Sequence, residues 1–220
     1  MDNTETINTN MLHFKALVNR LEKTMIYVDH SVDVDGNYIN GETYSIEFEN
    51  ILLLTCSEFE NVAKCICRHA GIKLAKKPTI YQLKEKIIDK YPGVNDVIIE
   101  TFNNTLTPLK YWGKNTCQTI DEENGKTVET RDSKEIEWWT DYNNIKHNRE
   151  TNFCKANLNN CIYSMAALYV LLLFDCRIVD ANMSLCALGD GAYFMCKYVP
   201  VIRATAPLRE LPGFEKIIIS

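Results

Sequence analysis

The chain has 220 residues, of which 46% are hydrophobic and 24% are charged, the balance of an ordinary globular protein. Its 24 Lys and Arg against 29 Asp and Glu leave a net charge of −5, which argues against a strongly basic nucleic-acid coat, and the composition does not favour disorder, collagen or a coiled-coil array. A chain of this length buries roughly 70% of its extended surface, so it needs no disulfide or metal to fold.

The amino-terminal segment and the most apolar segment both favour a soluble protein. The first ten residues, MDNTETINTN, are polar and acidic, so we expect no secretory signal. The most apolar run, Cys161–Phe174, is shorter than the roughly 20 residues that span a bilayer. It therefore predicts a buried core helix, and we expect no contact with a membrane.

Cysteine usage indicates a reducing compartment. The nine cysteines are an odd number and no two have C-x-x-C spacing, so neither a disulfide framework nor a redox motif is indicated. We expect a cytoplasmic protein with inert core thiols, no metal and no cofactor. The cysteines are Cys56, Cys65, Cys67, Cys117, Cys154, Cys161, Cys176, Cys186 and Cys196.

Apolar spacing in the first half of the chain predicts helices. Residues recur at near-helical intervals from Met11 to Tyr27, and a polar loop follows from Asp29 to Glu42. The dense apolar content of Tyr44–His69 predicts a long central helix, for which Gly71 is a natural stop.

After Pro78, one apolar stripe predicts a helix that closes at Tyr91-Pro92-Gly93. Residues Val94–Trp112 fit another helix, interrupted near Pro108. The polar stretch Lys114–Thr130 contains Gly125 and reads as a loop or small hairpin.

The last part of the chain predicts two helices and an irregular tail. Asp132 followed by Glu135 resembles a helix cap and opens a helix that runs towards His147, and Thr151–Asp175 predicts the last long helix. From Asn182, glycines and prolines punctuate short β-branched runs, which fit an irregular extension or short strands. We therefore predict an all-α bundle of about five to six helices over residues 1–180 and a C-terminal extension over 181–220.

The polar loop Ser31–Glu42 has two interpretations. Numbered from Ser31 as a calcium-binding loop, it carries acids at positions 3, 5 and 12 and glycine at position 6. However, position 1 is a serine and position 8 is Tyr38, and Asp35-Gly36 is a common tight-turn pair. The turn is favoured over the calcium site.

Charge is unevenly distributed along the sequence. Eight acids and no Lys or Arg lie between Thr24 and Ala63, so the rest of the chain carries +3. A group of lysines follows at once, and it is either a basic face that steers phosphate backbones or a solvated helix surface, with the second interpretation favoured. These lysines are Lys73, Lys76, Lys77, Lys84, Lys86 and Lys90.

The most informative segment is Trp138–Arg149. On a helix, Trp138, Tyr142 and Ile145 share a face with the stem of Arg149, which we expect to pack into the bundle. His147 falls nearly opposite, in a polar group that can hold a phosphate while the imidazole moves a proton. The alternative is a capped helix end whose polar groups bond loop carbonyls. The polar neighbours of His147 are Thr140, Asn143, Asn144, Lys146 and Arg149.

The same segment carries a family resemblance. The sequence YNNIKHNR, then Phe153, Ala156-Asn157-Leu158 and the apolar residues 166–171, resembles a group of uncharacterised bacterial proteins with HEPN-like (higher eukaryotes and prokaryotes nucleotide-binding) all-helical domains. The acidic segments Phe48-Glu49-Asn50 and Ser57–Glu60 fit the same resemblance, which covers roughly Tyr44 to Phe174.

This resemblance implies a mechanism and a dimer. HEPN ribonucleases typically form homodimers and cleave RNA without a metal, by attack of the ribose 2′-oxygen on its own phosphodiester, with an arginine four to six residues before a histidine. Here His147 matches the histidine, but Thr140, Asp141 and Tyr142 occupy the arginine positions. Lys146 and Arg149 are the cations next to the motif.

Two functions follow. In the first, the chain is a metal-independent endoribonuclease of phage defence or a toxin–antitoxin pair, acting through His147 with Lys146 and Arg149. Thr140, Asn143 and Asn144 would contact RNA, and Glu58 or Glu60 would contribute from the neighbouring helix by fixing the histidine tautomer. In the second, it is a non-catalytic helical module that binds a partner encoded nearby, with Trp138, Trp139 and Tyr142 as packing or interface anchors.

Overall fold

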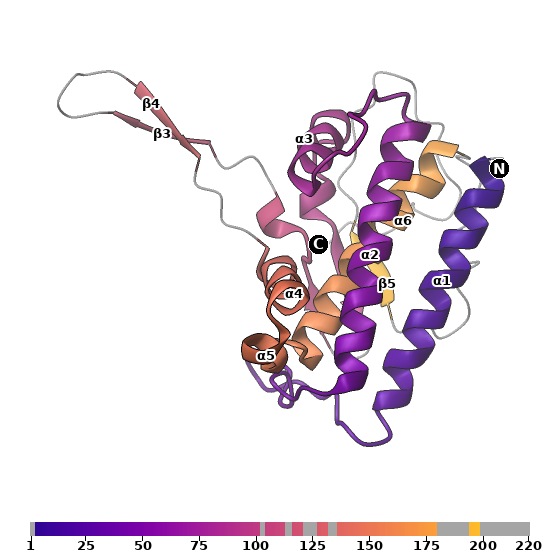
Figure 1. Cartoon of the computed structure of the whole chain (residues 1–220), viewed down its shortest axis with the longest axis vertical. Coiled ribbons are helices and arrows are strands. Elements are labelled where there is room, and N and C mark those ends of the chain that lie inside the picture. The colour runs from indigo at the N-terminus through magenta and orange to yellow at the C-terminus, as the bar shows by residue number, and fades with distance from the viewer. Residues whose placement is uncertain are drawn as a thin grey trace, which may run out of the picture.

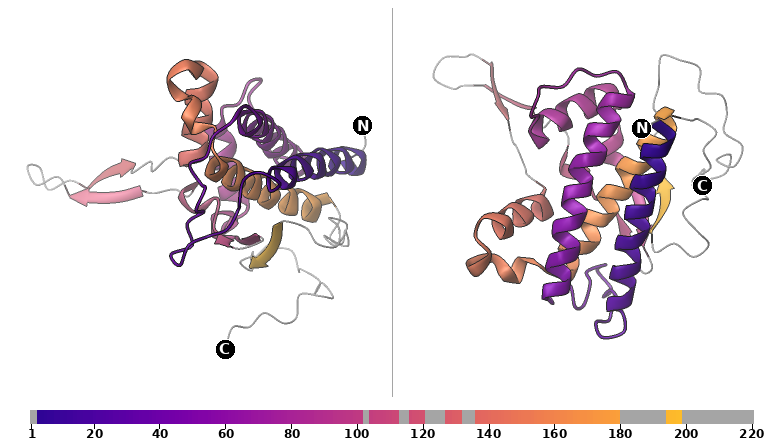
Figure 2. Two further views of the ribbon diagram at one scale, coloured as in Figure 1. Left: turned by 90° about the horizontal axis from the view of Figure 1, so that it is seen from below. Right: turned by 45° about the vertical axis from the view of Figure 1, so that its right-hand side comes forward.

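Three long helices form the body of the protein in a computed structural model that describes residues 3–101, 104–112, 116–120, 127–131, 136–179 and 194–198. These helices are α1 (Asn3–Thr24), α2 (Ile46–His69) and α6 (Leu158–Val179). Figure 1 shows α1 and α2 running antiparallel, and Figure 2 shows α6 packed between them and a small sheet. The prediction of a mostly helical bundle is confirmed at this level.

Local interactions determine both ends of helix α2. The Ser45 hydroxyl accepts the Phe48 backbone N–H at 3.1 Å, which caps the amino-terminal end. At the other end Gly71 adopts a left-handed conformation (φ 69°), which glycine tolerates without strain. Between these points the helix buries one apolar side, including Ile51, Leu52 and Phe59.

Helix α6 is the core helix that its composition predicted. Residues 158–175 form the one segment among the described residues that is apolar and long enough to cross a membrane, but 89% of that segment is buried inside the protein. Its burial against α1, α2 and α4 accounts for its hydrophobicity.

Two shorter helices flank the body. Helix α3 (Ile80–Lys90) opens with a capping box between Thr79 and Gln82 and buries Leu83 and Ile87. Helix α4 (Glu137–His147) is followed directly by the short helix α5 (Arg149–Asn152). Single 3₁₀ turns lie at η1 (Val94–Asp96), η2 (Lys110–Trp112) and η3 (Phe153–Lys155).

The structure contains strands that correct part of the all-α prediction. Strand β1 (Ile98–Thr101) pairs antiparallel with β2 (Thr105–Leu106) on one side and β5 (Phe194–Tyr198) on the other. The helix expected over residues 94–112 was therefore wrong. Strands β3 (Thr116–Ile120) and β4 (Thr127–Arg131) form a hairpin, the alternative proposed for this polar stretch. Figure 1 shows the hairpin apart from the helices.

Other boundaries also differ from the predictions. Helix α1 begins at Asn3 rather than Met11, and the helix expected from Thr151 is interrupted before α6 starts at Leu158. The interruption arises because the backbone there pairs with another segment: the Ala156 carbonyl accepts the Ser45 N–H at 3.3 Å. The cap expected at residues 132–135 and the β-branched runs 199–204 and 214–220 lie outside the described residues.

Candidate functional site

His147 is the last residue of α4 and is exposed. The face assignment for this helix is confirmed: Trp138, Tyr142 and Ile145 are only 3%, 6% and 2% exposed, and the two aromatic residues belong to a ring cluster with Phe59 and Trp139. Because His147 falls on the opposite side, its imidazole meets solvent. Among the described residues no hydrogen bond or ion pair involves this ring.

Arg149 is oriented by a buried acid. Its Nη2 lies 2.5 Å from Oε2 of Glu49, in the first turn of α2. The Glu49 side chain is 4% exposed, whereas that of Arg149 is 63% exposed. A nearly buried carboxylate needs a cationic partner, so one edge of the guanidinium is anchored while the rest remains available to a ligand. The helix prediction for position 149 needs adjustment, because α4 has ended and Arg149 begins α5.

Lys146 is positioned by its own helix. Its Nζ lies 3.3 Å from the Tyr142 hydroxyl oxygen and 5.4 Å from the centroid of the same ring, which is a cation–π arrangement. Lys146 and His147 occupy the last turn of α4, where the helix dipole favours positive charge. Lysine, imidazole and anchored arginine thus follow one another at the junction of α4 and α5.

The remaining polar residues of the predicted site have mixed roles. Asn144 is exposed and Asn143 partly buried, and within the described part of the chain neither side chain bonds a loop carbonyl. Thr140 is different, because its hydroxyl donates to the Ile136 carbonyl at 3.3 Å within its own helix. Asn143 and Asn144 therefore fit the ligand-facing interpretation better than Thr140 does.

Glu58 and Glu60 do not serve as partners of His147, which corrects that expectation. Glu58 Oε1 lies 3.4 Å from Nδ1 of His13 on α1, and Glu60 Oε1 lies 2.5 Å from the Lys64 ammonium one turn later. The reason is the rise of α2: these acids stand about 14 to 17 Å further along the helix than Glu49, the residue that reaches Arg149. Glu49 is the acid that sequence reasoning left out of the site, although its place beside buried Phe48 in the first turn marked it as needing a cation.

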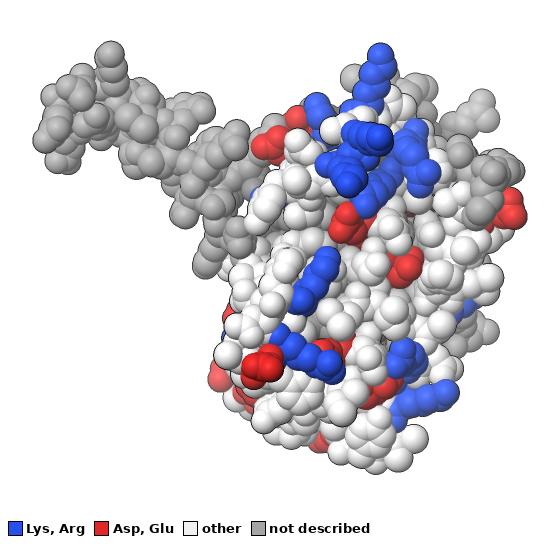
Figure 3. Space-filling view, viewed as in Figure 1, with Lys and Arg blue, Asp and Glu red and all other residues white. Residues whose placement is uncertain are grey.

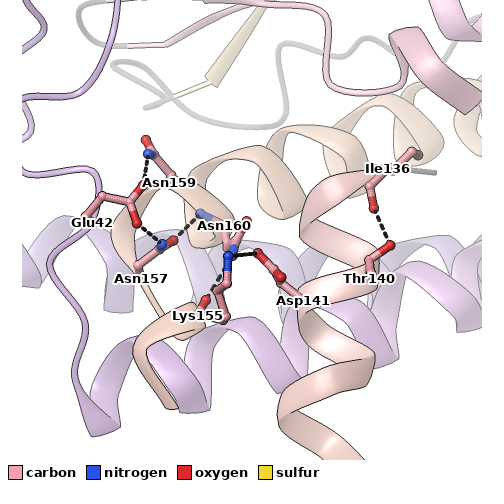
Figure 4. A network of polar contacts seen from close by, with 8 residues as sticks. All are labelled: Glu42, Ile136, Thr140, Asp141, Lys155, Asn157, Asn159 and Asn160. Carbon is pink, nitrogen blue, oxygen red and sulfur yellow. Dashed lines mark hydrogen bonds and ion pairs between the residues drawn. The ribbon is translucent and has the colours of Figure 1, made fainter. Parts of the chain in front are cut away.

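A partly buried polar network lies next to this surface and ties three segments together (Figure 4). Asn157 and Asn159, at the start of α6, donate to the two oxygens of Glu42 at 3.0 and 3.2 Å. Asn160 donates to Asp141 Oδ2 at 2.9 Å and to the Lys155 carbonyl. The network fixes the entry of α6 against the loop after α1 and against α4.

Residues 140–142, where the resemblance noted above would place an arginine, have structural contacts instead. Asp141 is 6% exposed, accepts from Asn160, and lies 3.6 Å from the Lys155 ammonium. Tyr142 is in the core, and Thr140 bonds its own helix. These three positions therefore stabilise the fold, and the cations beside His147 come from positions 146 and 149.

The loop at Ser31–Glu42 is a turn closed by its own hydrogen bonds. Asp33 Oδ1 accepts the backbone N–H groups of Asp35 and Asn37 at 2.9 and 2.8 Å, and Gly36 has φ 80°. The calcium alternative would need Glu42 to turn towards this loop, but both oxygens of Glu42 are bonded to α6. Among the described residues no group of three acidic, histidine or cysteine side chains converges as metal ligands.

In the described part of the chain five cysteines are free thiols, and four of these are buried: Cys56, Cys65, Cys67 and Cys161. Burial raises the thiol pKa of Cys67 to about 11 and those of Cys56 and Cys161 well above the ordinary value. Thiols with such pKa values are weak nucleophiles at neutral pH, which agrees with the expectation of inert core thiols.

A second titratable pair lies at the opposite end of α2. His69 Nδ1 is 2.7 Å from Asp175 Oδ1, and the two side chains are 6% and 0% exposed. Burial raises the pKa of Asp175, and the hydrogen bond from His69 opposes that change. The pair joins the carboxyl-terminal end of α2 to α6; the sequence placed Asp175 in an apolar run without indicating its partner.

Comparisons with known proteins do not identify a relative: no family model matches the chain, and no curated protein or solved structure matches it. The fold and the surface at the α4–α5 junction therefore define the protein only as a mostly helical chain with an exposed histidine between two cations.

Proposed function

We propose that the protein is a HEPN-like helical domain that binds RNA and cleaves it without a metal, with His147 transferring the proton. The observation that carries this proposal is the exposed imidazole of His147, which stands between Lys146 and Arg149 in the sequence and has no polar partner among the described residues. A histidine that only capped the helix would bond a loop carbonyl, and no carbonyl in the described part of the chain is bonded to His147.

The chemistry requires the group types that stand at this junction. The ribose 2′-oxygen attacks the adjacent phosphorus as the 2′-hydroxyl proton passes to a base. The bond from phosphorus to the 5′-oxygen then breaks as that oxygen takes up a proton. The products are a 2′,3′-cyclic phosphate and a 5′-hydroxyl. Neutral His147 would accept the first proton and its imidazolium would supply the second, while Lys146 and Arg149 offset charge that develops on the phosphate oxygens.

A homodimer and a biological setting form part of the proposal through the HEPN resemblance. In a symmetric dimer two copies of His147 would be available, one as base and one as acid. We place the protein in the cytoplasm, in phage defence or a toxin–antitoxin pair with a protein partner encoded nearby. Asn143 and Asn144 are the amides that would orient the RNA.

The alternative of a non-catalytic interaction module has one observation in its favour and one against it. In its favour, no arginine occupies positions 140–142. Against an interface at these residues, Trp138 and Tyr142, which were expected to be packing or interface anchors, are buried in the core and therefore serve packing. A module of this kind would therefore need other contact residues.

The test is cleavage of a labelled RNA in excess EDTA by the wild-type protein and by His147→Ala. General acid–base catalysis contributes roughly a hundredfold or more, so we expect the variant to lose cleavage by at least about that factor while its melting temperature stays unchanged. The control is His13→Ala, because His13 is also an exposed histidine, with a side chain 58% exposed.

The products and the control decide between the interpretations. The 5′ fragment should end in a 2′,3′-cyclic phosphate, and His13→Ala should cleave like the wild type. If the wild type binds RNA but leaves it intact, the non-catalytic alternative replaces the proposal. If His147→Ala unfolds the protein, the residue is structural and the proposed role is lost.

A further inference from the structure

The region that follows the acidic segment is strongly basic. From Lys64 to Lys90 the chain has eight Lys and Arg against two acids, Glu85 and Asp89. The preceding forty residues, from Thr24 to Ala63, have eight acids and no Lys or Arg. Helix α2 spans this change of sign, so its two ends carry opposite charge.

The structure gathers these cations on one end of the molecule. The last turn of α2, the connection to α3 and one side of α3 all contribute exposed basic side chains, and Figure 3 shows them together at the top of the view. We define the α2–α3 basic surface as the exposed residues Arg68, Lys73, Lys76, Lys77, Lys86 and Lys90.

The lysines of this surface differ from other cations of the protein in their pairing. Arg20, Lys64, Arg149 and Lys155 each form an ion pair with a named acid. Within the described ranges, no ion pair involves any of the five lysines of the α2–α3 basic surface. Their charges therefore remain available to an external anion.

The backbone that carries the lysines is ordered by specific contacts. The end of α2 is held to α6 by the pair of His69 and Asp175 at 2.7 Å. The chain reverses at Gly71, where the Ile72 N–H bonds the Cys67 carbonyl at 2.8 Å. The capping box then starts α3, whose Leu83 and Ile87 are fully buried. The cations are thus presented in a defined arrangement across two helices.

The chemistry of the surface favours an extended polyanion. Its charges spread over two helices and their connection, which suits a chain of phosphates better than one phosphate group. An anionic membrane would also attract lysines, but membrane-surface helices insert an exposed apolar face, and the apolar side of α3 is buried. The one large apolar side chain exposed on α3 is Tyr81, at 51%, and a tyrosine ring can stack on an unpaired base.

We propose that the α2–α3 basic surface binds the phosphate backbone of single-stranded RNA. The inference rests on the proposed function only in taking RNA as the polyanion. It adds a second contact that is separate from the His147 junction: Glu49 and Arg68, which mark the two regions on α2, are 19 positions apart, or about 30 Å along the helix. RNA would therefore be held at one end of α2 and presented to His147 at the other.

The experiment compares two triple variants with the same net charge. The first, Lys73→Gln/Lys76→Gln/Lys77→Gln, removes charge from the surface. The control, Lys15→Gln/Lys23→Gln/Lys110→Gln, removes the same charge from exposed lysines elsewhere. The probe is a fluorescent RNA of about 20 nucleotides with every 2′-oxygen methylated, which prevents attack by that oxygen, and binding is followed by fluorescence anisotropy across a range of salt concentrations.

Each phosphate contact to a single strand contributes a salt exponent of about 0.7, or roughly fivefold in affinity at about 0.1 M salt relative to 1 M. We expect the first triple variant to bind about 10- to 100-fold more weakly, with the salt exponent lower by about 2. The control should stay within about threefold of the wild type.

Several results would overturn the inference. Equal losses in both triple variants would mean that net charge alone matters, and an unchanged affinity in the first variant would exclude the surface. Lysine-dependent binding to phosphatidylserine vesicles without RNA binding would assign the surface to a membrane. Absence of RNA binding by the wild type also refutes it, whereas binding without cleavage refutes only the proposed function.

Discussion

The buried His30 should make the stability of the protein depend on pH. His30 is only 1% exposed, and its Nε2 lies 2.9 Å from the Thr24 hydroxyl oxygen. That hydroxyl donates its one hydrogen to the Leu21 carbonyl at 2.6 Å, so the imidazole must donate from Nε2 to Thr24. Burial lowers the pKa of His30 to about 4, and the nearby Asp29 charge opposes that change.

The size of this change in the free energy of unfolding follows from proton linkage. The ordinary pKa is 6.5 and the folded pKa about 4, so between these values the unfolded chain binds more protons than the folded one and stability falls as pH falls. Above about pH 6.5, neutral His30 makes its full contribution to the free energy of unfolding. We expect this free energy to be lower by about 2 kcal/mol at about pH 5 and by about 3 kcal/mol below about pH 4. Asp175 acts in the opposite direction, because its pKa is raised and its contribution decreases as pH rises.

The assay is urea unfolding of the wild type and His30→Gln at about pH 7 and about pH 5. Glutamine places an amide donor near Thr24 but does not titrate in this range. The variant should be less stable at neutral pH because it packs less well, yet its loss between the two pH values should be smaller than that of the wild type by about 2 kcal/mol. Equal losses in the two proteins would refute the linkage of His30 to stability.

Two further predictions concern the contacts around the junction. In Glu49→Gln, Arg149 loses its charged anchor but can be solvated, so RNA cleavage should fall about tenfold while the melting temperature stays nearly unchanged; a large drop in melting temperature would show a mainly structural pair. In Gly41→Ala, the added methyl overlaps the Asn159 amide and displaces it from the network. Urea unfolding should show a loss of about 1 kcal/mol, and Asn159→Ala should add little to that loss, since full additivity would exclude the coupling.

The helices that the sequence predicted share a strong local signal. In α2 and α3 the apolar residues repeat at helical spacing, polar caps stand at the start, and a glycine or a Pro-Gly pair follows the end. The face of α4 was predicted correctly for the same reason. Such signals depend on neighbours within one or two turns, so they can be recognised without knowledge of the rest of the fold.

The incorrect predictions depend on contacts between distant residues. Strand β1 is four residues long, and its alternating burial is stabilised by β5, which lies about 95 positions later in the chain. The start of α6 is set by Ser45 and Thr43, whose backbone groups pair with Ala156 and Leu158. Neither interaction leaves a periodic pattern, because the pairing partner is supplied by tertiary structure.

In the candidate site, too, some residues can be recognised from their sequence neighbours and others only from contacts between distant segments. His147 and its two neighbouring cations could be identified from one short segment. Glu49 could not, since its role depends on α2 bringing it against Arg149, 100 positions away in the sequence. A carboxylate beside a buried phenylalanine indicates that some cation is needed, but only the packing of α2 against the α4–α5 junction determines which one.

Pairing also changes what the net charge of −5 means for a polyanionic partner. Of the eight acids between Thr24 and Ala63, three form ion pairs with an arginine or a lysine: Glu47, Glu49 and Glu60. Asp29, Asp33 and Glu42 accept hydrogen bonds from neutral groups, so they keep their charge but are held in place. The five lysines of the α2–α3 basic surface have no such ion pairs among the described residues. A sum over the sequence counts every charge equally, whereas an approaching phosphate chain meets acids that are partly neutralised by ion pairs on one part of the molecule and, among the described residues, lysines without ion pairs on another.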